Sequence, residues 1–331
     1  MITALKKWKN YSVNGNKRIY IYGSLFIREF PGIDFFCFNG IPLAGRPKPR
    51  VALHSPGLFT MKIFLKLLFS VLLSGLLLGA SPEKALLSDT RKEMLSVSVV
   101  FDNVAGSQNL VLDKKEYSNA AGESFNISQL QYFVSNIKFH SKDGTTYTVN
   151  QDNSYFLVQE NNPATQVIKL KIPAGDYDRM IFVLGVDSLR NTLDISKRTG
   201  VLDPSSAMDN GMYWGWNSGY IFLKMEGNSP AAPEDPTGNH KFRFHIGGFG
   251  GYSAPTINNI KTISLDLTKR GILKMRKERK EKLIVKADVL TLFNGITNLS
   301  IAAHPSVMFS EYSVHVANNY SKMFFHDRTE N

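Results

Sequence analysis

The feature that most constrains the fold is a succession of short segments in which apolar and polar residues alternate. In LSVSVVF, Leu95 to Phe101, every second side chain is a large apolar one, the period of two that is typical of a half-buried strand. Turn-forming sequences such as KDG, NNP and PAGD separate these segments, and no long amphipathic helical pattern competes. Further runs of this kind are TTYTV, SYFLVQE, QVIKLKI, DRMIFVLGV, GYIFLKMEG, HKFRFHIGG, IKTISLDL, KLIVKADVL and YSVHV. The pattern predicts an all-β chain that forms a single β-sandwich domain with Greek-key-like connections.

Two segments fit this pattern less well. The apolar residues of ISQLQYFVSNI, Ile127 to Ile137, match neither the strand nor the helix period, so its type stays open. KRGILKMRKERKEKL, Lys269 to Leu283, mixes acids and bases between apolar strands. We expect a solvated hairpin there, with a docking patch for an acidic partner as the alternative.

An export signal is predicted inside the chain. From Met61, two lysines precede an apolar run, Leu67 to Leu78, that ends in small residues, as in a secretory signal peptide. Because signal peptides begin chains, we expect translation to start at Met61; the alternative is a signal anchor with a short basic tail. The expected organisation is an extension at residues 1–60, a signal peptide at 61–80, a linker at 81–94, the β domain at 95–326 and a tail at 327–331.

The charge distribution argues against nucleic acid as a partner. The net charge is +11, but residues 1–66 hold 11 of the 39 lysines and arginines and 2 of the 28 acids. The remainder is close to neutral, so a basic binding surface is not expected on the mature chain. The single cysteine, Cys37, also lies in the expected extension. We therefore predict a periplasmic or cell-surface protein without disulfides and without a stable membrane span, whose soft-metal ligands would have to be histidine or methionine.

Sequence motifs for catalysis are missing. No phosphate-binding loop, G-x-S-x-G elbow or H-E-x-x-H helix occurs. No nucleophile, base or acid pair stands out either, so we expect no enzymatic activity.

Two segments carry residues suited to binding. In KFRFHIGG, Lys241 to Gly248, alternation places His245 on the face opposite Phe242, Phe244 and Ile246, next to glycines that allow close approach of another segment. In MYWGWNSGY, Met212 to Tyr220, strand geometry places Met212, Trp214 and Trp216 on one face. Histidine is a common metal ligand, whereas paired tryptophans are typical of a core or of a sugar-stacking platform.

In combination these segments resemble the MbnP-like copper-binding proteins. The resemblance is carried, in a fixed order, by YFVSNIKF, PAGDYDRMIFVLGVDS, GVLDP, MYWGWNSGYIFLKMEG, FRFHIGG, ADVLTLF and NNYSKMF. It covers about residues 95 to 326, and the W-x-W-N-S-G-Y core is its most specific part. The family includes the periplasmic protein encoded beside methanobactin genes and the copper-regulated surface proteins of methanotrophs.

The resemblance implies an exported, non-catalytic all-β protein that binds copper for acquisition, storage or delivery. In the family a tryptophan is oxidised to kynurenine by a dihaem, cytochrome peroxidase-like partner of the MbnH type, and joins histidines in binding copper. Trp214 and Trp216 match the tryptophan motif, and His245 matches the histidine of the F-H-x-G-G strand. No histidine lies next to either tryptophan in this sequence. Candidates to replace this missing ligand are His240 and His326, and Met212, His304 and His315 also stay open.

Two alternatives to copper binding remain at this stage. The first is a non-catalytic β-sandwich module whose aromatic platform binds a glycan or a protein partner without metal. The second is an enzyme, which the missing catalytic motifs disfavour.

Overall fold

The computed structural model of the protein describes residues 21–22, 25–26, 92–217 and 219–331. Two compact units divide the chain, Met1–Ala85 and Leu86–Asn331. In the first unit the described residues form strands β1 (Ile21–Tyr22) and β2 (Leu25–Phe26), which pair antiparallel. The expected signal peptide and most of the expected linker lie outside the described residues.

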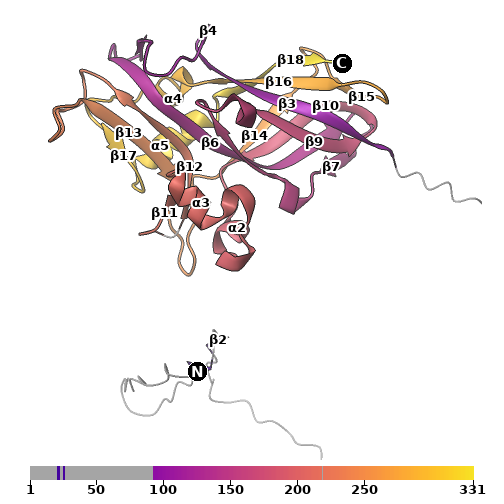
Figure 1. Ribbon diagram of the computed structural model, residues 1–331, viewed down its shortest axis with the longest axis horizontal. Helices are drawn as coiled ribbons and strands as arrows, with labels where there is room; N and C mark the ends of the chain where they lie inside the picture. The colour runs from indigo at the N-terminus through magenta and orange to yellow at the C-terminus, as the bar shows by residue number, and fades with distance from the viewer. Residues whose placement is uncertain (1–20, 23–24, 27–91, 218) are drawn as a thin grey trace, which may run out of the picture. The chain divides into compact units, whose positions relative to one another are not determined.

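The second unit is built from two β-sheets (Figure 1). The larger sheet follows the order β14-β10-β6-β12-β13-β17, and β5, β7, β8, β11 and β15 each pair with one strand of this path. The smaller sheet follows the order β18-β16-β3-β4, with β9 paired to β3. The strands of the larger sheet are β5 (Tyr117–Ser118), β6 (Ser124–Ser141), β7 (Thr146–Thr148), β8 (Tyr155–Gln159), β10 (Gly175–Leu184), β11 (Tyr213–Trp214), β12 (Gly219–Asn228), β13 (Lys241–Gly247), β14 (Lys261–Asp266), β15 (Leu273–Met275) and β17 (Ser306–Val307). Those of the smaller sheet are β3 (Met94–Ala105), β4 (Gln108–Asn109), β9 (Val167–Pro173), β16 (Glu281–Asp288) and β18 (Phe324–Glu330).

The two sheets pack face to face around the main hydrophobic core. Phe101 of the smaller sheet meets Tyr132 and Phe182 of the larger sheet, with ring centroids 6.2 and 5.6 Å apart. Phe324 of β18 closes the same aromatic cluster, with its ring centroid 5.5 Å from that of Tyr132. These inward side chains come from the alternating segments, so the predicted all-β sandwich is confirmed.

A second, smaller core covers the outer face of the larger sheet. Residues 185–217, here called the outer lobe, form α2 (Ser188–Thr192), two short 3-10 turns, α3 (Pro204–Asp209) and β11 on this face (Figure 1). Asp187 and Asp203 cap the two helices by accepting hydrogen bonds from the backbone N–H groups of Arg190 and Ser205. The outer core consists of Phe133, Leu157, Val186, Leu202, Ala207, Met212, Trp214, Tyr220, Ile221, Phe222 and Phe249.

Strand β6 is buried on both faces, which explains why its sequence shows no clear period. Its Tyr132 and Val134 belong to the main core, whereas Phe133 between them belongs to the outer core. A strand that is buried on both faces has no polar face, so apolar residues run on without alternation.

The segment YSVHV was expected to be a strand, and this expectation is wrong. It leads into α5 (Ser313–Tyr320), where Val316, Ala317 and Tyr320 are buried. The spacing of these three residues places them on one face of a helix. The valines of YSVHV alternate with polar residues, so the local sequence resembles a strand instead. At 8 residues, α5 is the longest helix of the described residues, and none of those helices is both long and apolar enough to cross a membrane.

The charged segment Lys269–Leu283 does not form the expected hairpin. Its Leu273 and Met275 are buried in β15, which pairs with β10 in the larger sheet, while β16 pairs with β3 in the smaller one. The segment therefore crosses from one sheet to the other. The chain end also differs from the expected tail, because β18 pairs with β16 as far as Glu330.

Candidate functional site

His245 lies on the outer face of β13, as the alternation predicts. Phe242, Phe244 and Ile246 are fully buried in the main core. The His245 side chain points the other way and keeps 12% of its surface exposed.

A carboxylate and an ammonium group lie beside the His245 imidazole. His245 Nε2 is 2.7 Å from Oε1 of Glu226, and Lys224 Nζ is 3.4 Å from the same oxygen. The two residues come from β12, in which Lys224 is directly opposite His245. The pKa of Glu226 is lowered to about 2, chiefly by the hydrogen bond from His245. Burial opposes this shift, and the charge of Lys224 adds to it. The carboxylate is therefore ionised at neutral pH and acts as an acceptor only.

This contact fixes the role of each imidazole nitrogen. Because an ionised carboxylate accepts hydrogen bonds, Nε2 of His245 must donate. In the neutral ring, Nδ1 then carries a free lone pair, and no residue of the described chain forms a hydrogen bond to it. A histidine that donates one ring N–H to a carboxylate and leaves the other nitrogen free has the arrangement common to metal-binding histidines.

The Trp214 ring packs on the same face of the larger sheet. Trp214 pairs with Gly219 of β12, and its ring lies against Gly247, where a Cβ atom would be only 2.7 Å from ring carbon Cζ3. Gly247 follows His245 by two positions, so the two residues share a face and their Cα atoms are roughly 7 Å apart. Trp214 and His245 thus lie on the same face of the larger sheet, near the end of β13.

Trp216 occupies a different environment from Trp214. Trp214 is 6% exposed and belongs to the outer core, whereas Trp216 is 67% exposed. Strand β11 ends at Trp214, so Met212, Trp214 and Trp216 do not share one strand face as predicted. The two indole rings nevertheless remain in contact, with centroids 5.4 Å apart and planes tilted by 43°.

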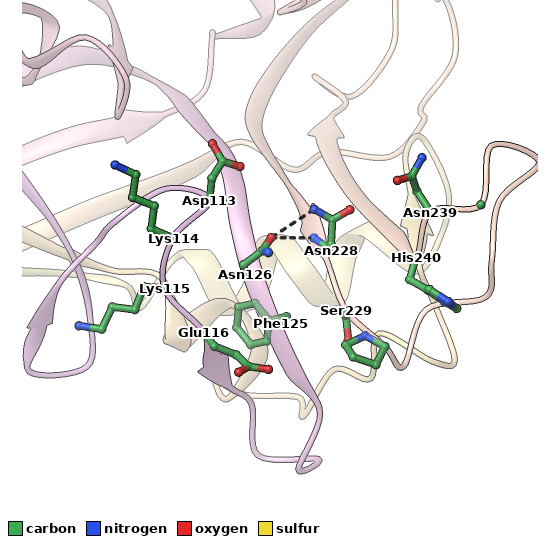
Figure 2. Close-up of a pocket in the computed structure, with 12 residues that line it drawn as sticks. Asp113, Lys114, Lys115, Glu116, Phe125, Asn126, Asn228, Ser229, Asn239 and His240 are labelled. Carbon is green, nitrogen blue, oxygen red and sulfur yellow. Dashed lines mark hydrogen bonds between the residues drawn. The ribbon is translucent and has the colours of Figure 1, made fainter.

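His240 lies apart from His245. It lines a cavity of about 510 Å³ together with the loop that carries Asp113 and the strand ends at Asn126 and Asn228 (Figure 2). Its Nδ1 donates a hydrogen bond to the carbonyl oxygen of Ala232, at 2.6 Å. Five residues of extended strand separate the two histidines by roughly 16 Å, and their side chains point to opposite faces. His240 is therefore not a second ligand for a metal at His245.

His326 is also separated from His245. It lies in β18 of the smaller sheet, is 6% exposed, and contacts Thr329 Oγ1 through Nε2 at 2.9 Å. Its Nδ1 is buried without a hydrogen-bond partner. Burial lowers the pKa of His326 below the ordinary value of 6.5.

This burial predicts an acid-sensitive contribution to stability. As the pH falls through about 6.5, the unfolded chain takes up a proton at His326 that the folded state resists, so the free energy of unfolding decreases. We expect wild-type protein to lose more stability between about pH 7.5 and pH 5.5 than the variant His326→Gln. Urea unfolding of both at the two pH values measures this, with His240→Gln as an exposed-histidine control. Equal pH dependence in wild type and His326→Gln would contradict the prediction.

The described residues contain no group of three or more histidine, cysteine, aspartate or glutamate side chains placed to hold a metal ion. Sequence reasoning missed Glu226 and Lys224, although the alternation of GYIFLKMEG places both on its polar side. The sequence does not show the register between β12 and β13, which places Lys224 and Glu226 next to His245.

Comparisons with known proteins identify a family for the segment that carries these residues. The model of the MbnP family matches residues 95–309. A structure search finds MbnP from Methylosinus trichosporium, with 18% sequence identity, a TM-score of 0.45, and coverage of 63% of this chain and 80% of that chain. No curated protein matches. Since the family match spans most of the β-sandwich, including Trp214, Glu226 and His245, the chain belongs to the MbnP family.

Proposed function

We propose that the protein is an exported, non-catalytic copper-binding protein that acts in copper acquisition, storage or delivery. His245 binds copper through Nδ1, and Trp214, after conversion to kynurenine, supplies a second nitrogen. The observation that carries the proposal is the free Nδ1 of an imidazole that Glu226 holds through Nε2, on the face where Trp214 packs. Imidazole and nitrogen donors suit copper.

The conversion of Trp214 supplies a donor that the intact chain lacks. Oxidative opening of the indole ring adds two oxygen atoms in a four-electron step, and water then releases formate to leave an aryl amine. A dihaem, peroxidase-like partner carries out the oxidation, in which two molecules of hydrogen peroxide accept two electrons each and leave as water. Trp214 is favoured over Trp216 as the modified residue because only its ring lies against Gly247, close to His245.

In this proposal the oxidising partner contacts Trp216. The Trp216 ring is exposed and contacts Trp214, and Met208, whose sulfur lies near Gly215, is 51% exposed. Exposed aromatic and methionine side chains are enriched at protein interfaces. This surface gives the oxidising partner a route to the buried indole.

Mass spectrometry of the peptide that contains Met212 to Lys224 tests the proposal. In protein isolated from its host with its natural partners, we expect Trp214 to gain one oxygen atom and lose one carbon atom, the change from tryptophan to kynurenine. The same change at Trp216 would reverse the assignment of the two residues. Two intact tryptophans would reduce the copper site to His245 alone. A glycan- or protein-binding module with Trp216 as its platform would then become the better explanation.

A further inference from the structure

We infer that the outer edge of strand β9 is a docking site for an extended, acidic segment of a partner protein, which adds to the smaller sheet as a further strand. The inference is independent of the proposed function. The docking site shares no residue with the candidate site around His245.

A groove of about 480 Å³ separates edge strands of the two sheets. Its walls come mainly from β7, β8 and the segment between them in the larger sheet, and from β9 in the smaller sheet. Three consecutive residues of β9 line the groove, Lys169, Leu170 and Lys171. Successive side chains of a strand point to opposite faces, so the groove follows the backbone edge of β9 and not one of its faces.

The register of β9 shows which backbone groups face this groove. β9 pairs with β3 along its whole length, and the N–H group of Ala174 extends the pairing by donating to the carbonyl oxygen of Glu93. In an antiparallel pair every second residue bonds to the neighbouring strand. Counted from Ala174, Lys171 and Lys169 are the residues between, so their N–H and C=O groups point away from β3. The Tyr147 hydroxyl, which donates to the carbonyl oxygen of Lys171 at 3.4 Å, agrees with this direction.

Most of these outward backbone groups are unpaired. No described residue forms a hydrogen bond to the N–H or C=O group of Lys169, or to the N–H group of Lys171. A row of unpaired backbone groups on a sheet edge is a template for another strand. Proteins that bind peptides by strand addition obtain affinity from such main-chain hydrogen bonds.

Charge determines which kind of strand fits this edge. The side chains of Lys169 and Lys171 are exposed, and the described residues that line the groove include no acid. A second copy of β9 would place lysines beside lysines, and like charges on neighbouring strands are destabilising. An acidic segment would instead pair with both lysines.

The inner wall of the groove is apolar. Tyr147 and Phe156 are partly buried against the main core and line the groove, as does the buried Val149. Side chains of an added strand alternate between the two faces of the smaller sheet. Those that point inward would pack on this wall, and those that point outward would lie beside Lys169 and Lys171. The partner segment is therefore expected to alternate apolar and acidic residues.

The experiment uses fluorescent peptides about as long as β9 and measures their binding to the purified protein by fluorescence anisotropy. One peptide alternates valine and glutamate, and a second alternates valine and lysine. A third repeats the first with N-methyl groups on every second residue, which removes the N–H groups that would face β9. We expect the valine–glutamate peptide to bind about tenfold or more tightly than the valine–lysine peptide. N-methylation should weaken its binding by about tenfold or more, because several main-chain hydrogen bonds are lost.

Charge reversal in the protein locates the site. Lys169→Glu combined with Lys171→Glu should weaken binding of the valine–glutamate peptide by about tenfold or more. Lys241→Glu combined with Lys274→Glu is the matched control, since it changes the net charge equally at exposed strand positions of the larger sheet. This control should bind as wild type does. Thermal unfolding confirms that both variants are folded.

Three results would overturn the inference. The first is no binding of the valine–glutamate peptide at about 1 mM protein, the weak limit of specific recognition. The second is an equal loss in both charge-reversed variants, which would mean that only the net charge attracts the peptide. The third is unchanged binding of the N-methylated peptide, which would indicate a site for polyanions in general instead of strand addition.

Discussion

Replacement of His245 by alanine is expected to weaken copper binding by about 100-fold or more, since even partners of a metal-binding histidine contribute about 10- to 100-fold. The physical reason is the loss of Nδ1, a nitrogen that no residue of the described chain otherwise engages. The measurement is a competition titration with a copper chelator, at equal protein concentrations and on protein with and without kynurenine. Retention of wild-type affinity would show that copper, if bound, is held elsewhere.

Two further variants separate ligand loss from general damage. Glu226→Gln keeps the shape of the side chain but removes the ionised acceptor that orients His245, so we expect an intermediate loss of about tenfold. His240→Ala removes an exposed histidine that lines a separate cavity, and we expect no change in affinity. A loss in His240→Ala as large as that in His245→Ala would argue against a single site on the outer face.

Replacement of Gly227 by alanine is expected to destabilise the protein by about 3 kcal/mol or more, because overpacking at a rigid site is costly. A Cβ atom at Gly227 would lie 1.9 Å from the carbonyl oxygen of Asn126 in β6 and 2.7 Å from the ring of Phe242. Neither neighbour can move freely, since one is backbone in a paired strand and the other is fully buried. Thermal unfolding should show a decrease in Tm of roughly 10 °C.

Gly215→Ala is the matched control for this prediction. Its Cβ atom would find Met208 Sδ as nearest neighbour at 3.9 Å, an ordinary contact, and its φ lies outside the left-handed region. We expect a change of about 0.5 kcal/mol or less, as for surface substitutions in general. Equal losses in the two variants would mean that the loss of glycine flexibility, and not the contact with β6, causes the effect.

The fold could be predicted where one face of a strand is polar. Leu95 to Phe101 alternates because β3 buries one face only, whereas β6 conceals its type because Phe133 packs into the outer core. YSVHV was mistaken for a strand since its alternating valines hide a helical face completed by Ala317 and Tyr320. The alternation of apolar and polar residues thus identified most strands. It failed for a strand that is buried on both faces and for a short helix.

The candidate site was only partly predictable for a different reason. Alternation alone placed His245 on the outer face. The contacts of His245 with Glu226 and Lys224 depend on the pairing of β12 with β13, which no local pattern specifies. The family resemblance made His326 a candidate ligand alongside His245, but His326 lies in the smaller sheet. Only the topology reveals that the two histidines belong to different sheets.

The separation of the two cores has a consequence for local opening of the chain. The main core lies between the sheets, while the outer core lies between the larger sheet and the outer lobe. The lobe can therefore detach in a partial unfolding step while the two sheets stay packed, at a free energy below that of global unfolding. Amide hydrogens of α2, α3 and β11 should exchange with solvent faster than those of β3, β10 and β16. Trp214 would be uncovered in such an opening without dismantling the sandwich that carries His245.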